Sequence, residues 1–322
     1  MRYSLSPGWM VDFAKDEIVV KNEIRGISLK KIKNVEAIHT YLLKNSFLPS
    51  EIGLELTDYL LNENIIRKDI HLESSIENSK YKKQIDFWSY FRTNANSIHE
   101  VLGEKKIMIV GLGGIGSIVL EILAGAGIKN FTLVDSDKVE PSNLNRQFLY
   151  LDSDIGRYKT DSSSDNISKR HSDLIITKRI MNYPSRDFKD LINESDFVVS
   201  AIDQPSLKSA IKLCQESWLL NKSSAFAACG IYKAVTSPIF DKNKSKNSPI
   251  DSCKFNKNDE SLITPPVSAS SGGWNSMIAS ILSEQILLYL AGVDEEVSYH
   301  DYTYTLRDNG KIKTIHKNTI TL

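Results

Sequence analysis

The chain from residue 105 onward alternates between short apolar runs and longer segments with helical patterning. Residues 116–127, GSIVLEILAGAG, predict a helix that ends at glycines. The short apolar runs predict strands of a buried sheet: KIMIV (106–110), FTLVD (131–135), DLIITK (173–178), DFVVSAID (196–203) and SSAFAACG (223–230). Because strands alternate with helices, the pattern predicts an α/β fold with a Rossmann-like, mainly parallel sheet.

Two segments near the C-terminus add to this picture. Residues 300–318, HDYTYTLRDNGKIKTIHKN, alternate around Asp308-Asn309-Gly310 and predict an antiparallel C-terminal hairpin. Residues 274–290 carry apolar side chains at helical spacing, but serine, glutamate and glutamine interrupt them. They therefore predict a buried helix rather than a membrane span.

The first 78 residues follow a different pattern. WMVDFAKDEIVVKN (9–22) predicts a β-hairpin, and residues 34–45 and 49–66 predict two helices. In the second helix the apolar residues are expected on one face: Ile52, Leu54, Leu56, Tyr59, Leu60 and Leu61. A hairpin with short helices predicts a small winged-helix-like module over residues 1–78, followed by a second domain over residues 79–322.

Charge and composition exclude several classes of partner. The 322 residues include 40 Lys+Arg and 40 Asp+Glu, and this formal net charge of zero argues against nucleic acid and against anionic membranes. The N-terminus lacks the apolar run of a secretory signal, and three scattered cysteines fit a reducing cytoplasm. The N-terminal module has no basic recognition helix, so peptide binding along a strand edge is as reasonable a function for it as DNA binding.

Four glycines between the first strand and its helix carry the first functional signal. Gly111, Gly113, Gly114 and Gly116 permit a tight turn and let phosphates approach the backbone at a helix N-terminus. Asp135 closes the next strand, where a carboxylate can hold ribose hydroxyls. These features predict a nucleotide site, and taken alone they favour an NAD-dependent enzyme.

The residues after Asp135 change that interpretation. Hydride transfer has no use for a polar and cationic set past the strand's carboxyl end, whereas attack of a carboxylate on a nucleotide α-phosphorus needs cations, because both reactants are anionic. Arg146 and Lys159 could screen this repulsion, while Asn143 and Gln147 could orient phosphate or ribose. Asp203, after the strand 196–203, could hold Mg²⁺ with the triphosphate, although an N-cap before Pro205 is an alternative role. The full set is Asp135, Asp137, Asn143, Asn145, Arg146, Gln147, Lys159 and Asp203.

Five ordered elements, G-x-G-G-x-G, D-x-D, N-x-x-R-Q, G-x-x-K and a strand-final aspartate, give a specific resemblance. In this order they resemble the adenylating domain of the ThiF, MoeB and ubiquitin-activating-enzyme superfamily, over about residues 80–322. The resemblance implies that ATP and Mg²⁺ convert a carboxylate into an acyl adenylate, in a homodimer or pseudo-dimer. It implies Mg²⁺ near Asp203 and ATP contacts at Gly113, Gly114, Asp135, Asp137, Asn143, Arg146, Gln147 and Lys159.

Two departures from the superfamily pattern narrow the prediction. The usual pair of C-x-x-C motifs is missing, since Cys253 stands alone in DSCKFN, so we expect no zinc site. Where the family places an arginine that reaches the partner subunit, this chain has Lys80-Tyr81-Lys82-Lys83-Gln84. Lys83 keeps the charge without the bidentate fork, and Arg92 is the other candidate. Some relatives use a loop cysteine as a nucleophile, a role for which Cys253 is a weak candidate.

The N-terminal module favours one branch of the superfamily by its architecture and position. It resembles the arrangement in the microcin C maturation enzyme and the pantocin A biosynthesis enzyme, where such a module captures a ribosomally made precursor peptide. The leading hypothesis is a cytoplasmic adenylyltransferase in peptide antibiotic biosynthesis, whose product is a cyclised, dehydrated or nucleotidyl peptide. The alternatives are an activator of a sulfur carrier or ubiquitin-like protein, a catalytically inactive nucleotide-binding scaffold, and an NAD-dependent oxidoreductase.

Overall fold

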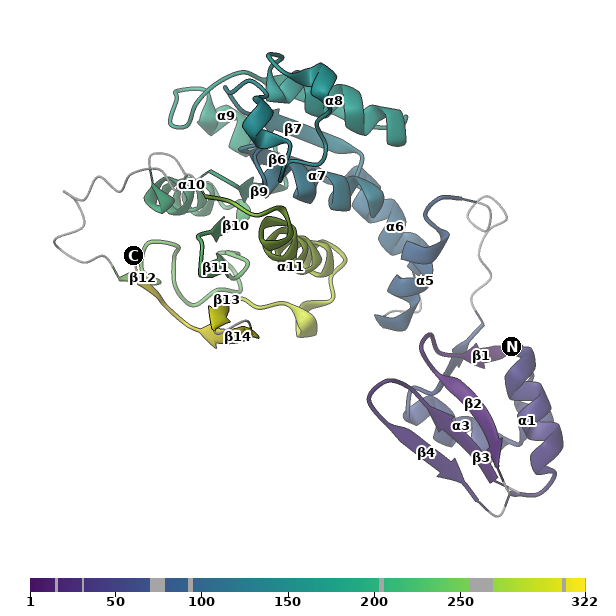
Figure 1. Cartoon of the computed structure of the whole chain (residues 1–322). Coiled ribbons are helices and arrows are strands. Elements are labelled where there is room, and N and C mark those ends of the chain that lie inside the picture. The colour runs from purple at the N-terminus through teal and green to yellow at the C-terminus, as the bar shows by residue number, and fades with distance from the viewer. Residues whose placement is uncertain are drawn as a thin grey trace. The chain divides into compact units, whose positions relative to one another are not determined.

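The computed structural model describes residues 1–14, 17–30, 32–69, 79–91, 95–202, 206–254, 269–308 and 311–321. The chain forms two compact units, Met1–His99 and Glu100–Leu322, drawn from purple to blue and from blue to yellow in Figure 1. The boundary expected between residues 78 and 79 borders residues 70–78, which lie outside the described residues, so it stays a prediction.

The N-terminal unit contains two small antiparallel sheets and short helices. Strands β2, β3 and β4 form a three-stranded sheet, and β1 pairs with β5. The predicted hairpin and the first predicted helix are confirmed, whereas the winged-helix identity stays a prediction. The elements are β1 (Tyr3–Leu5), β2 (Met10–Ala14), β3 (Glu17–Lys21), β4 (Gly26–Leu29), α1 (Val35–Lys44), α2 (Pro49–Ile52), α3 (Leu54–Asn62), β5 (Ile66–Lys68) and α5 (Lys82–Phe91).

The single helix expected over residues 49–66 is wrong. Gly53 has φ +93°, a conformation that ends α2 before α3 begins at the next residue. The change of direction moves Leu54 to the surface, where it is 69% exposed, while Ile52 and Leu60 remain in the core of the unit. The apolar pattern therefore identified helical residues but not the break within them.

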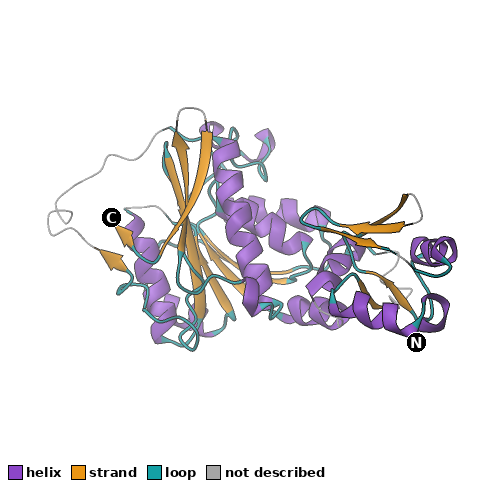
Figure 2. Ribbon diagram, turned by 90° about the horizontal axis from the view of Figure 1, so that it is seen from below, coloured by secondary structure: helices purple, strands orange, loops and turns teal. Residues whose placement is uncertain are grey.

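The C-terminal unit places one sheet between helices, as Figure 2 shows. Helices α7 and α11 pack against each other, and α10 packs on β9 and β10. Helix α6 (Ala95–Glu104) crosses the boundary between the units. The other elements are β6 (Lys106–Val110), α7 (Gly116–Gly125), β7 (Asn130–Val134), η1 (Pro141–Asn143), η2 (Asp152–Asp154), α8 (Lys159–Arg170), β8 (Ile175–Arg179), α9 (Phe188–Asn193), β9 (Phe197–Ser200), α10 (Leu207–Leu219), β10 (Ser223–Cys229), β11 (Lys233–Thr236), β12 (Cys253–Lys254), α11 (Gly272–Leu290), η3 (Asp294–Glu296), β13 (Tyr302–Asp308), β14 (Lys311–Lys317) and β15 (Ile320–Thr321).

The large sheet has the order β14-β13-β11-β10-β9-β6-β7-β8 among the described residues. Strands β10, β9, β6, β7 and β8 are parallel, and β11, β13 and β14 continue the sheet in antiparallel fashion. This arrangement confirms the predicted α/β fold, the mainly parallel sheet and the C-terminal hairpin. After β6 the chain first builds outward through β7 and β8, and then returns to place β9 on the other side of β6. The crevice at this reversal is where open α/β sheets bind ligands.

Helix α11 confirms the buried helix predicted over residues 274–290. It packs on α7, β10 and β11, so its apolar positions are covered by protein. Within the described parts of the chain, no helix has the length and hydropathy needed to cross a membrane.

Residues 241–252 form a mostly exposed loop that two side chains tie to the rest of the unit. Asp241 is buried and accepts a hydrogen bond from the Tyr289 hydroxyl at 2.8 Å, while Lys244 pairs with Asp294 at 2.7 Å. These contacts fasten the tract to α11 and to the turn that follows it.

Candidate nucleotide-binding site

The turn between β6 and α7 requires glycine at two positions. Gly111 has φ +90°, and a Cβ there would lie 2.5 Å from the carbonyl oxygen of Ala201, at the end of β9. A Cβ on Gly116 would lie 1.8 Å from the carbonyl oxygen of Gly111. The backbone of the turn is therefore packed against itself and against the neighbouring strand, which leaves no space for a side chain.

The two middle glycines face side chains from other parts of the chain. A Cβ on Gly113 would lie 3.9 Å from Gln147 Nε2, and one on Gly114 would lie 3.0 Å from Asn275 Cγ. Gln147 is buried, and its Oε1 has no hydrogen-bond partner among the described residues. A buried amide with an unpaired acceptor beside a glycine turn fits contact with a bound ligand.

Asn275 is a residue of the site that the sequence did not reveal. It lies in the first turn of α11, where its Nδ2 donates to Ser270 Oγ at 2.8 Å and to the Ser271 carbonyl at 2.9 Å. These bonds hold the amide against Gly114. No local pattern signals this contact, because α11 begins more than 150 residues after the turn.

Asp135 lies at the end of β7 and is tied to the glycine turn. Its Oδ2 accepts the Leu112 N–H at 2.6 Å, and its Oδ1 accepts the Asp137 N–H at 2.7 Å. Burial raises the pKa of this carboxyl, although the charge of Lys159 and the two amide bonds act in the opposite direction. Each carboxylate oxygen can accept a second hydrogen bond, so ribose hydroxyls could still bind here.

Lys159 and Asp137 form an ion pair beside Asp135. The Lys159 ammonium lies 2.9 Å from Asp137 Oδ2, and the Lys159 N–H donates to the Asp137 carbonyl at 2.9 Å. The lysine side chain is only 8% exposed, whereas that of Asp137 is 66% exposed. The aspartate of D-x-D and the lysine of G-x-x-K are 22 residues apart in the sequence, and the fold brings them into contact.

The segment 141–147 carries the remaining predicted contacts. Asn143 is buried, and its Oδ1 accepts the Glu140 N–H at 3.1 Å, which stabilises the short helix η1. Arg146 Nη1 donates to the Ser142 carbonyl at 2.6 Å and to Asn145 Oδ1 at 2.9 Å. Its Nη2 and Nε have no hydrogen bond to a described residue, so this edge of the guanidinium is available to an anion.

Other predicted residues fall outside this description or have a different setting. Asp203 and Arg92 lie outside the described residues. Helix α10 begins at Leu207 with Ser206 as its N-cap. Lys83 is exposed on α5. Within the described residues no group of three or more His, Cys, Asp or Glu side chains could hold a metal ion.

The cysteines lack the environment of a nucleophile. Cys214 is fully buried in α10, and burial raises its pKa to about 12. Burial also raises the pKa of Cys253 to about 11, with smaller opposing contributions from Tyr302 and Ser252. Since the thiolate is the reactive form, both thiols are protonated and unreactive near neutral pH.

Comparison with known proteins decides the family. The model of the ThiF family matches residues 81–319, about three quarters of the chain. The chain belongs to the ThiF family. The superfamily resemblance inferred from the motifs is thus confirmed, and the glycine turn, Asp135 and Lys159 all lie within the matched range.

Curated relatives of this ThiF-family chain include adenylyltransferases. The molybdopterin-synthase adenylyltransferase of Escherichia coli K12 is 34% identical over 112 residues, which cover 35% of this chain and 45% of that protein. The sulfur carrier protein ThiS adenylyltransferase of the same organism is 32% identical over 108 residues, covering 34% and 43%. The chain therefore spans less than half the length of these curated relatives.

Solved structures match the chain over nearly its whole length. E. coli MccB with ATP has a TM-score of 0.78 at 21% identity and covers 99% of this chain and 98% of that one. The microcin C7 biosynthetic enzyme MccB with N-formylated MccA has a TM-score of 0.77 at 20% identity, covering 99% and 97%. PaaA has a TM-score of 0.71 at 19% identity, covering 98% and 99%. At these identities the likeness shows a shared fold.

Proposed function

We propose that this protein is an ATP-dependent adenylyltransferase that activates a carboxylate of a peptide. An oxygen of the carboxylate attacks the α-phosphorus of ATP, the bond from that phosphorus to the bridging oxygen breaks, and pyrophosphate leaves. The product is an acyl adenylate, from which a nucleophile of the peptide could then displace AMP or attack phosphorus to give a nucleotidyl peptide. In this reaction two anions meet, so cations near the α-phosphate must stabilise the transition state.

The observation that carries this proposal is the buried Lys159 ammonium beside Asp137, next to Asp135 and the glycine turn. A nicotinamide enzyme needs the turn and the acid but not the lysine. An arriving triphosphate could take the place of Asp137 as the partner of Lys159, and the free edge of Arg146 would supply a second cation. Gln147 and Asn143 would orient the nucleotide, and Asp203 would hold Mg²⁺ with the phosphates.

The peptide substrate rests on three further considerations. The solved structures that match nearly the whole chain include MccB with N-formylated MccA and MccB with ATP. The N-terminal unit adds a separate module of strands and short helices to the nucleotide-binding unit. Peptides can bind such a module by extending a sheet at a free strand edge. We therefore propose that residues 1–78 bind a ribosomally made precursor peptide, and that the enzyme acts as a cytoplasmic homodimer in peptide antibiotic biosynthesis.

The test is an assay of AMP and pyrophosphate release with ATP, Mg²⁺ and candidate peptides, beginning with any short reading frame beside the gene. Turnover that depends on the peptide and is abolished in Arg146→Ala and Asp203→Ala would support the proposal. ATP binding without turnover on any carboxylate would instead identify an inactive scaffold, and NADH oxidation would identify an oxidoreductase.

A second candidate is activation of a sulfur carrier or ubiquitin-like protein, which the names of the curated relatives favour. The sequence argues against it, because the C-x-x-C pairs are missing and the Cys253 thiol is protonated at neutral pH. The same assay separates the two candidates if a carrier protein with a C-terminal glycine replaces the peptide.

A further inference from the structure

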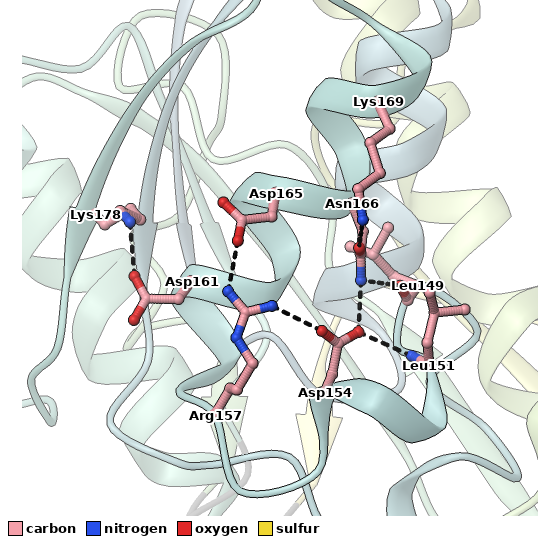
Figure 3. Close-up of polar contacts among 9 residues, drawn as sticks. All are labelled: Leu149, Leu151, Asp154, Arg157, Asp161, Asp165, Asn166, Lys169 and Lys178. Carbon is pink, nitrogen blue, oxygen red and sulfur yellow. Dashed lines mark hydrogen bonds and ion pairs between the residues drawn. The ribbon is translucent and has the colours of Figure 1, made fainter.

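A polar cluster centred on the buried Asp154 lies where the connection between Gln147 and Lys159 packs against α8. We define the Asp154 cluster as Asp154, Arg157, Asp165 and Asn166, which Figure 3 shows with their hydrogen bonds. Asp154 ends η2, and Asp165 and Asn166 lie on α8, the helix that begins with Lys159. None of these residues is a specified position of the motifs that predicted the nucleotide site, and Arg157 is a variable position of G-x-x-K.

Asp154 is the centre of this cluster. Its Oδ2 accepts the Leu151 N–H at 2.9 Å and Asn166 Nδ2 at 2.6 Å, and its Oδ1 accepts Arg157 Nη1 at 2.9 Å. The side chain of Asp154 is 3% exposed. A carboxylate this deeply buried is costly unless donors satisfy both of its oxygens, and here three donors do so.

Asn166 and Arg157 extend the cluster to its surroundings. Asn166 Nδ2 also donates to the Leu149 carbonyl at 3.0 Å, while Lys169 Nζ donates to Asn166 Oδ1 at 3.0 Å and fixes the orientation of the amide. The other nitrogen of the Arg157 fork, Nη2, donates to Asp165. The cluster thus joins residues 149–157 to the middle of α8 (Figure 3).

Both ends of this connection lead to residues of the candidate nucleotide site. Downstream, the Gly156 N–H donates to the Val139 carbonyl and the Val139 N–H to the Arg157 carbonyl, each at 2.9 Å. This pairing continues to the bond between Lys159 N–H and the Asp137 carbonyl. Upstream, Leu149 is two residues from Gln147. A shift of the connection would therefore move Lys159 relative to Asp137 and to Gln147.

We propose that Asp154, Arg157 and Asn166 are positioning residues that hold the Lys159 ammonium where the triphosphate of ATP must bind. They touch neither nucleotide nor substrate. The inference rests on the proposed function, because it assigns Lys159 to the phosphates. A cluster that only stabilised the fold would not act through one particular side chain, whereas this inference links the cluster to the position of the Lys159 ammonium.

The test is a double-mutant cycle on ATP affinity in the full-length chain. Kd for ATP is measured for the wild type, Asp154→Asn, Lys159→Met and the double variant. Loss of one charge-assisted bond corresponds to roughly a fivefold to thirtyfold change in an equilibrium constant, and we expect each single variant to weaken ATP binding by about that factor. We expect the double variant to bind ATP no more weakly than Lys159→Met, because a misplaced methionine has no charge to lose.

Asp161→Asn is the matched control. Asp161 lies on the same helix and pairs with Lys178 at 2.6 Å, but its ion pair does not reach the connection 149–157 (Figure 3). It should leave Kd for ATP unchanged. If Asp154→Asn fails to fold, Arg157→Gln replaces it in the cycle, since the Arg157 side chain is 42% exposed.

The outcomes separate the inference from the proposed function. If the double variant weakens ATP binding by the product of the two single effects, the positioning role is overturned. An unchanged Kd for ATP in Asp154→Asn overturns it as well. Both results leave the proposed ATP site intact. An equal loss in Asp161→Asn also overturns it, because general destabilisation would then be the cause. If Lys159→Met itself binds ATP as the wild type does, the proposed site is wrong.

Discussion

Substitution of Gly116 by alanine tests the geometry of the nucleotide turn most directly. In the middle of most helices this change is stabilising, because alanine loses less backbone entropy than glycine on folding. Gly116 begins α7, but its Cβ would lie 1.8 Å from the carbonyl oxygen of Gly111, 2.9 Å from the carbonyl carbon of Gly111 and 3.3 Å from Ala201 Cβ. The obstacle is backbone, which cannot rotate away as a side chain could.

The magnitude follows from that distance. Real Cβ contacts do not fall below 3.0 Å, so the Gly111 carbonyl and the start of α7 must separate by about 1.2 Å, the difference from 1.8 Å. Overpacking of this kind costs about 1–3 kcal/mol, and the rigid backbone places Gly116→Ala at about 3 kcal/mol. A displacement of about 1 Å at a reacting centre can also lower a rate by roughly 100-fold. We therefore expect both lower stability and a much lower kcat/KM for ATP.

The assay pairs urea denaturation with ATP-dependent pyrophosphate release. Gly125→Ala is the matched control, since Gly125 ends the same helix and a Cβ there has no atom within 4 Å. We expect this control to gain about 0.5–1 kcal/mol and to keep full activity. If Gly116→Ala is as stable and as active as Gly125→Ala, the close packing of the turn is refuted.

Three other predictions test separate parts of the site. Lys159→Met should lower kcat/KM for ATP by at least about tenfold with little change in thermal midpoint, as steady-state kinetics and calorimetry would reveal. Cys253→Ser should leave turnover unchanged, and loss of activity together with a trapped thioester in the wild type would contradict the raised pKa of this thiol. Burial would raise the pKa of Asp154, but hydrogen bonds from Leu151 N–H, Asn166 and Arg157 lower it below its usual range. Its ionised form therefore stabilises the fold above about pH 4, so the free-energy difference between wild type and Asp154→Asn, about 2 kcal/mol near pH 7, should shrink as the pH falls below 4. A difference in urea stability that is the same at pH 3 and pH 7 would disprove this linkage.

Most of the large sheet could be predicted from sequence because most of its strands are marked locally, but β11 (Lys233–Thr236) was missed. KIMIV is β6 without a residue of error, and the alternation around residues 309 and 310 located both strands of the hairpin. The helix break at Gly53 was missed because the helix prediction also used only a local pattern. Apolar spacing reports which residues are helical over several turns, whereas a break depends on the φ of one glycine.

The positions of the candidate site residues were predictable to the extent that these residues follow strands. Asp135 and Gly111 are placed by the ends of β7 and β6, which parallel pairing brings to one edge of the sheet. Asn275 and Asp154 could not be found in this way. Their contacts join segments that no periodicity relates, namely α11 with Gly114 and η2 with α8. A buried aspartate in a polar stretch is indistinguishable from an exposed one until its donors are known.

Asp135 shows why its position in the sequence and its contacts in the structure must be considered together. The sequence assigns its carboxylate to the ribose, but the same oxygens accept the N–H groups of Leu112 in the glycine turn and of Asp137. Removal of this side chain would free a buried N–H in the turn as well as remove the predicted ribose contact, so lost ATP binding in Asp135→Ala cannot separate the two causes. Arg146 and Lys159 are cleaner probes, because their charged groups bond to carbonyl or side-chain oxygens outside the turn. The two cations are therefore the better test of the proposed adenylation, whereas Asp135 also supports the glycine turn through the Leu112 N–H.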